Sequence, residues 1–241
     1  MKRHHLLPLL AFFIYLLNSC GNAPKSSVES PQKVVIAYVT SWSEIMPNPA
    51  LVTHINYAFG HVNDTFNGVR INNEERLKQI VALKKQKPEL KVLLSIGGWG
   101  SGRFSEMAAD EQNRLSFAKD CQRIVQEFGL DGIDIDWEYP TAGPSENGKH
   151  PDDTRNFNIV LKELREAIGN EKIISYASSS NADYVDWATA MLYLDYVNVM
   201  TYDMGNPPYH NAPLYYSSAI TKKRSVDQSI TLHVSKGIPL D

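Results

Sequence analysis

The sequence predicts an α/β fold built on a parallel sheet. Six short runs are rich in apolar and β-branched residues, as strands are. Between them lie segments whose apolar residues recur every three or four positions, as on one face of a helix. Such alternation favours right-handed crossovers, in either a doubly wound sheet or a (β/α)8 barrel, and periodicity alone does not choose between them. The predicted strands cover residues 34–40, 53–59, 91–96, 132–137, 172–177 and 196–201.

The predicted helices follow the strands in order. Leu77, Ile80 and Val81 share one helical face, and similar patterns cover residues 117–128 and 157–168. Gly129 and Gly169 come directly after the last two patterns, where helices commonly stop. A sixth helix is expected within residues 225–241, leading toward a seventh strand that lies beyond the sequence.

The first 32 residues are expected to lie outside this fold. Basic residues precede an apolar run, Leu6 to Leu17, that is too short to span a membrane but suits a secretory signal. Residues 17–20 (LNSC) resemble a bacterial lipobox, in which Cys20 becomes the lipidated first residue; the alternative is a simple secretory signal with an incidental cysteine. Residues 1–19 are therefore predicted as a signal peptide, 20–32 as a flexible tether and 33–241 as one domain.

The net charge and the cysteine and histidine content limit the kinds of binding partner to expect. The formal charge is −3, and removal of residues 1–19, which contain Lys2, Arg3 and no acid, makes it −5. This balance argues against nucleic acid as a partner, whereas a lipid on Cys20 would make the envelope membrane one. No Cys or His cluster has metal-ligand spacing, so neither a metal nor another cofactor is implied. Cys121, in a helical pattern, is interpreted as a small core residue.

The segment Asp131–Glu138 (DGIDIDWE) carries most of the functional information. On a strand, Asp134, Asp136 and Glu138 lie on one face, and the residues between them, including Trp137, lie on the other. Trp137 is therefore expected to pack against helices. Carboxyl groups stacked in this way destabilise the fold unless some are protonated or hydrogen-bonded, which raises a carboxyl pKa toward general-acid function. The plain alternative is a strand with a solvated edge.

This segment matches the DGxDxDxE signature of the family 18 glycoside hydrolases, the chitinases and their relatives. Residues 95–99 (SIGGW), 200–203 (MTYD) and 210–215 (HNAPLY) resemble further segments of that family, in the same order. The resemblance extends from about Lys33 to the end of the chain. It implies a (β/α)8 barrel, with the acids at the C-terminal end of the fourth strand, where barrel enzymes place their sites.

The resemblance also implies a mechanism. In this family the 2-acetamido group of the substrate attacks the anomeric carbon, and configuration is retained. Glu138 would protonate the leaving oxygen and later activate water. Asp136 would orient the acetamido N–H. Asp134 would share a proton with Asp136, so that these two carboxyl groups titrate as a coupled pair. Tyr202 would donate a hydrogen bond to the acetamido oxygen, and Asp203 would contact the sugar.

Further candidates surround these acids. Trp99 offers a flat apolar face to a sugar ring, and Gly98 lets substrate approach the backbone. Tyr38 and Phe59, near the ends of the first two strands, could line the pocket or pack in the core. The loop of residues 139–151 could shape the leaving-group subsites. The predicted substrate-binding residues are Tyr38, Phe59, Gly98, Trp99, Tyr139, Met200 and Asp203.

The expected function is hydrolysis of β-1,4-linked N-acetylglucosamine polymers, meaning chitin and its oligosaccharides, at the bacterial envelope or after secretion. Two alternatives remain: an endo-β-N-acetylglucosaminidase acting on glycoproteins, and a chitinase-like protein that binds chitin oligosaccharides without turnover. Because six strands are counted where a barrel has eight, the chain is expected to be an incomplete barrel with weak activity on its own.

Overall fold

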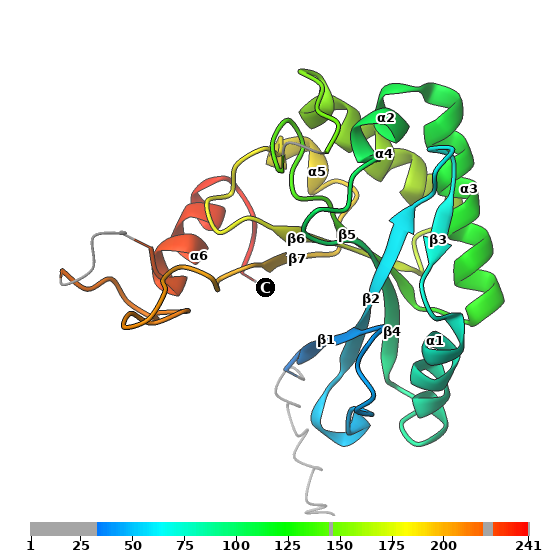
Figure 1. The fold of residues 1–241 in the computed structure, drawn as a ribbon, viewed down its shortest axis with the longest axis horizontal. Coiled ribbons are helices and arrows are strands. Elements are labelled where there is room, and N and C mark those ends of the chain that lie inside the picture. The colour runs from blue at the N-terminus through cyan, green and yellow to red at the C-terminus, as the bar shows by residue number, and fades with distance from the viewer. Residues whose placement is uncertain (1–32, 145–146, 219–223, 241) are drawn as a thin grey trace, which may run out of the picture. The chain divides into compact units, whose positions relative to one another are not determined.

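Six parallel strands lie side by side in the order in which they occur along the chain (Figure 1). The computed structural model describes residues 33–144, 147–218 and 224–240; the predicted signal peptide, the tether and Cys20 lie outside them. Successive strands pair in parallel throughout the sheet. The strands are β1 (Ile36–Thr40), β2 (His54–Val62), β4 (Lys91–Gly97), β5 (Gly132–Asp136), β6 (Ile173–Ser178) and β7 (Tyr196–Val199).

The strand order confirms the barrel type of fold. A doubly wound sheet reverses its strand order at a switch point, whereas a barrel keeps the chain order throughout. Here each strand pairs with its predecessor among the parallel strands, without reversal. Within the described ranges, β1 pairs only with β2 and β7 only with β6.

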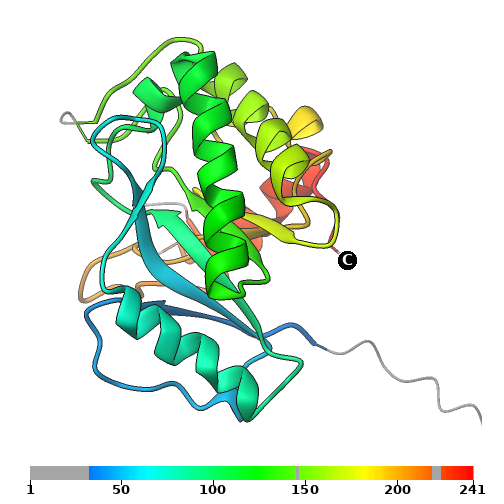
Figure 2. The ribbon, with the colours of Figure 1, turned by 90° about the vertical axis from the view of Figure 1, so that its right-hand side faces the viewer.

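The helices lie on the outer side of the sheet. Figure 2 looks onto α1 and α3, which lie in front of the strands, with α4 beside α3. Asn73, Asp110 and Ser225 cap α1, α3 and α6 by accepting a backbone N–H three residues on. Gly129 ends α3 in the left-handed region, as predicted. The helices are α1 (Glu74–Val81), α2 (Phe104–Ala109), α3 (Glu111–Phe128), α4 (Asp153–Ile168), α5 (Trp187–Ala190) and α6 (Val226–Ser235).

The structure corrects several predicted boundaries. β5 ends at Asp136 rather than 137, and β7 at Val199 rather than 201. The short helices α2 and α5 were not predicted. Neither was β3 (Val69–Ile71), which pairs antiparallel to an extended β2. Its Val69 N–H donates to Asp120 Oδ2 of α3 at 2.8 Å, so a contact distant in sequence helps to fix this strand, and local periodicity could not reveal it.

The two faces of the sheet differ in chemistry. Residues on the outer face, such as Ile133 and Ile135, join the helices in one buried apolar core. Trp137 packs in that core, as expected, stacked on Phe104 of α2 at 5.3 Å and edge-on to Phe157 of α4 at 5.8 Å. The inner face carries a row of buried polar side chains that includes Ser95, Asp134 and Ser175. No helix within the described ranges is long and apolar enough to span a membrane.

Candidate active site

The acid row lies on the inner face, at the C-terminal edge of β5. Asp134 is in register with Ser95 on β4 and Ser175 on β6, and Asp136 is in register with Gly97. Asp134 is fully buried and Asp136 is 5% exposed. Two carboxyl groups on a buried strand face need partners or protons, and the structure gives them different environments.

Asp134 is saturated with hydrogen bonds. Its Oδ2 accepts from the Tyr38 hydroxyl at 2.8 Å and the Ser95 hydroxyl at 2.7 Å. Its Oδ1 accepts from the Ser175 hydroxyl at 2.6 Å and Asn198 Nδ2 at 3.1 Å. Burial raises the pKa of Asp134, and these four hydrogen bonds oppose that rise because they stabilise the charged form. The donors come from four different strands, so the carboxylate holds the inner face together.

Asp136 is the less satisfied carboxyl group. Burial raises its pKa to about 8, and the charges of Glu138 and Asp134 add to the rise. Within the described part of the chain, its buried Oδ1 has no hydrogen-bond partner. The charge of Asp134 links the titration of the two carboxyl groups, while the hydrogen-bond donors on Asp134 come from other residues. The sharing of a proton between them stays a prediction from the resemblance.

Glu138 follows the strand end and is half-buried. Burial raises its pKa, and the carboxylate of Asp203 adds to that rise. A carboxyl group whose pKa is raised in this way can hold a proton closer to neutral pH, which is the requirement for a general acid.

The segment after β7 brings a phenol to the same place. Burial and the negative charges of Asp136 and Glu138 raise the pKa of Tyr202 to about 12, so its hydroxyl stays a neutral donor. Tyr202 is 53% exposed and open to a ligand. The neighbouring Asp203 has a left-handed backbone, and its N–H donates to Asn211 Oδ1 at 3.1 Å. Asn211, in the HNAPLY segment, thus fixes the strand-end conformation.

The two glycines of the SIGGW segment are required by internal packing. A Cβ on Gly97 would lie 2.0 Å from the Asp136 carbonyl oxygen, and one on Gly98 would lie 2.9 Å from the Phe59 ring. The Gly98 N–H donates to the Asp136 carbonyl at 2.9 Å. Gly98, expected to let substrate approach the backbone, has a second reason to be glycine, because it lets β4 pack closely against β5. Phe59 accordingly packs over Gly98.

Several residues around the site were not predicted from the sequence. Ser175 and Asn198 each contact Asp134, and their only signal is a polar residue within an apolar strand. Trp42, 71% exposed after β1, has its ring 6.4 Å from Phe59. Tyr38, proposed to line the pocket, donates to Asp134 and so belongs to the acid network.

The aromatic candidates differ in exposure. The Trp99 side chain is 70% exposed, as a sugar platform must be. Tyr139 is stacked on Tyr184 at 5.1 Å, which joins the loops after β5 and β6. Met200 follows β7, where its N–H donates to the Ser178 carbonyl of β6 at 2.9 Å. Among the described residues, no three His, Cys, Asp or Glu side chains are placed to hold a metal ion.

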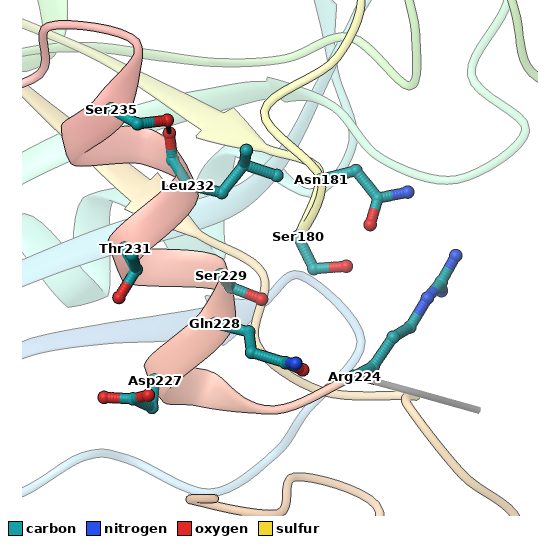
Figure 3. A pocket seen from close by; sticks show the side chains of 9 residues that line it. All are labelled: Ser180, Asn181, Arg224, Asp227, Gln228, Ser229, Thr231, Leu232 and Ser235. Atoms are coloured by element: carbon teal, nitrogen blue, oxygen red, sulfur yellow. Dashed lines mark hydrogen bonds between the residues drawn. The ribbon is translucent and has the colours of Figure 1, made fainter. Parts of the chain in front are cut away.

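A separate cleft of about 450 Å³ lies between α6 and the loop after β6 (Figure 3). In this view Gln228 and Leu232 point toward Ser180 and Asn181, whereas Asp227 points away from them. The acid row does not line this cleft. It is therefore distinct from the site built around Asp136 and Glu138.

Comparison with known proteins gives a consistent result. The family model described as glycosyl hydrolases family 18 matches residues 34–241. Chitinase A1 of Niallia circulans is 27% identical over 89% of this chain and 40% of its own length, and chitotriosidase-1 of Mus musculus is 30% identical over 85% and 50%. The chain thus spans half or less of these curated relatives.

Solved structures agree with the sequence relatives. The chitinase domain of the spore coat protein CotE from Clostridium difficile superposes with a TM-score of 0.81 and 31% identity, over 90% of this chain and 65% of that one. A family 18 N-acetylglucosaminidase from Paenibacillus barengoltzii gives 0.79 and 35%, over 86% and 66%.

Proposed function

The chain belongs to glycosyl hydrolase family 18, and on that premise we propose that it hydrolyses β-1,4-linked N-acetylglucosamine polymers by a retaining, substrate-assisted mechanism. One observation carries the proposal: Asp136 Oδ1 is buried and has no hydrogen-bond partner among the residues that the structure describes. A buried acceptor without a donor is costly, and the N–H of a 2-acetamido group would satisfy it. Glu138 follows two residues later, on the acid side of the strand.

The proposed reaction has two steps. In the first, Glu138 gives its proton to the glycosidic oxygen as the bond to the anomeric carbon breaks, and the acetamido oxygen of the substrate bonds to that carbon. Asp136 accepts the acetamido N–H, and the Tyr202 hydroxyl donates to the acetamido oxygen. In the second step Glu138 removes a proton from water, and the water oxygen attacks the anomeric carbon. The bond between that carbon and the acetamido oxygen breaks, so the acetamido group is restored and the configuration is retained.

The test is turnover by the wild type and by Glu138→Gln. Release of a chromophore from an N-acetylglucosamine oligosaccharide should fall by roughly a hundred- to ten-thousand-fold in the variant, because the general acid is lost. Oligosaccharide binding should persist, since the shape of the side chain is kept. Wild-type turnover by the variant would overturn the assignment.

Substrate class needs a separate comparison. Chitin oligosaccharides and a high-mannose glycoprotein should be offered to the same preparation. Cleavage of the glycoprotein alone would favour the endo-β-N-acetylglucosaminidase alternative. Binding without cleavage of either would favour a chitinase-like binding protein.

The proposal extends to location. We propose that Cys20 is lipidated and holds the domain at the bacterial envelope, with residues 20–32 as a tether. The LNSC segment after an apolar run supports this, and several acyl chains would anchor firmly, at about 0.8 kcal/mol per buried CH₂.

A further inference from the structure

A third buried carboxyl group, besides Asp134 and Asp136, lies near the site and outside the acid row. Asp153, the first residue of α4, is fully buried. Its Oδ1 accepts from the Ser105 hydroxyl of α2 at 2.8 Å. Its Oδ2 accepts from the N–H of His150 at 2.8 Å and of Thr141 at 3.2 Å. One side chain thus joins α2, α4 and the loop that follows Glu138.

The Thr141 contact fixes a turn directly after the proposed acid. Tyr139 and Ala142 exchange backbone hydrogen bonds at 3.3 and 3.0 Å, with Thr141 between them in the left-handed region. The chain then folds back on Glu138, so closely that a Cβ on Gly143 would lie 2.4 Å from the Glu138 carbonyl oxygen. Asp153 therefore reaches the backbone of Glu138 through one short turn.

The first turn of α4 also holds the facing loop. The Thr154 hydroxyl, next to Asp153, donates to the Tyr184 carbonyl at 2.9 Å. The Tyr184 ring stacks on Tyr139 at 5.1 Å. The turn after Glu138 is thus clamped from two sides by neighbouring residues of one helix.

We propose that Asp153 is a positioning residue for Glu138, holding the 139–142 turn so that the carboxyl group of Glu138 stays half-buried beside the acid row. The inference rests on the proposed function, because that function makes Glu138 the general acid. The geometric part, that Asp153 orders this turn, can be tested without turnover.

A matched control lies at the other end of the same strand. Asp131 also accepts a backbone N–H, from Val92 at 2.7 Å, and it pairs with Lys84 and with Lys91. It precedes β5, whereas Asp153 acts beyond the C-terminal end of that strand. Asp131→Ala should therefore weaken the fold without affecting the turn after Glu138.

The first measurement is hydrogen exchange of the full chain. In Asp153→Ala, the amides of Tyr139, Thr141, Ala142 and Gly143 should exchange roughly tenfold faster or more, because local opening becomes easier, while β5 amides stay protected. Asp153→Asn should restore protection, since its amide oxygen can accept both N–H groups and its NH₂ can donate to Ser105. Unchanged exchange in Asp153→Ala, or the same acceleration in Asp131→Ala, would overturn the proposal.

The second measurement follows the ionisation of Glu138. Burial raises its pKa, and the groups that contribute charge or hydrogen bonds are Asp203 from the segment after β7 and Tyr139 beside it. A loosened turn should admit water and lower that pKa. In ¹³C-labelled protein, with Glu138→Gln to assign the signal, the titration should move to lower pH in Asp153→Ala and stay in place in Asp131→Ala. A titration that does not move would overturn the proposal.

Turnover separates this inference from the proposed function. If the wild type is active, Asp153→Ala should lower kcat and move the alkaline limb of kcat/KM to lower pH, whereas Asp131→Ala should not. An inactive wild type would count against the function alone, because exchange and titration do not depend on turnover. Should Asp153→Ala fail to fold, Ser105→Ala removes one of the three donors and should accelerate exchange in the same turn by a smaller factor; no acceleration would overturn the proposal.

Discussion

The raised pKa of Asp136 makes a quantitative prediction about stability. In the unfolded chain this carboxyl group has its ordinary pKa of 3.8, whereas in the folded protein its pKa is about 8. Between these values the unfolded state binds fewer protons, so wild-type stability falls as pH rises. The interval from pH 3.8 to pH 7 is 3.2 units. At about 1.36 kcal/mol per unit, the free energy of unfolding falls by about 4 kcal/mol over this interval.

Asp136→Asn removes this penalty, because an amide stays neutral in both states. We expect the variant to exceed the wild type in free energy of unfolding by up to about 4 kcal/mol at pH 7, and by much less at pH 3. Urea unfolding at a series of pH values measures the difference. The exposed Asp183→Asn should follow the wild type at every pH. A constant difference between Asp136→Asn and the wild type from pH 3 to 8 would refute the reasoning.

Other predictions concern packing, binding and location. Trp137→Ala should lower the free energy of unfolding by about 3–5 kcal/mol, since it empties a buried site between two aromatic rings; a loss below 1 kcal/mol in urea unfolding would contradict the packing argument. Trp99→Ala should leave stability within about 0.5 kcal/mol but weaken N-acetylglucosamine oligosaccharide binding in calorimetry; unchanged affinity would exclude Trp99 as a platform. Cys20→Ala should abolish lipid labelling and release the protein from the membrane fraction, and an unlabelled, unanchored wild type would replace lipidation by simple secretion.

Sequence patterns predicted what depends on local geometry. Alternation along β5 placed Asp134 and Asp136 on one face and Trp137 on the other, because a strand fixes this at every second residue. The six parallel strands were found from their apolar runs, and Gly129 was identified as a helix end. The choice of a barrel over a doubly wound sheet needed the family resemblance.

What the sequence did not reveal depends on register between distant segments. A single serine or asparagine within an apolar strand, such as Ser175 or Asn198, has no visible partner until the strands are aligned on Asp134. The contacts of Asp153 could not be predicted either, because an acidic residue at the start of a helix is commonly explained by the helix dipole. Gly97 lies in the SIGGW segment, but its contact with the Asp136 carbonyl became visible only in the structure.

The donors on Asp134 have a consequence for the order of folding. Tyr38 on β1 and Asn198 on β7 are 160 residues apart, yet Asn198 Nδ2 donates to the Tyr38 hydroxyl at 3.1 Å and both bind the same carboxylate. Contacts of such long sequence separation form late, after the cost of closing the chain has been met by local structure. A folding intermediate containing the central strands and helices would therefore have a buried acid without its full set of donors. During refolding, the hydrogen bonds from Tyr38 and Asn198 to Asp134 should form after the helices. The surroundings of Asp134 would then be the last part of the sheet to become native.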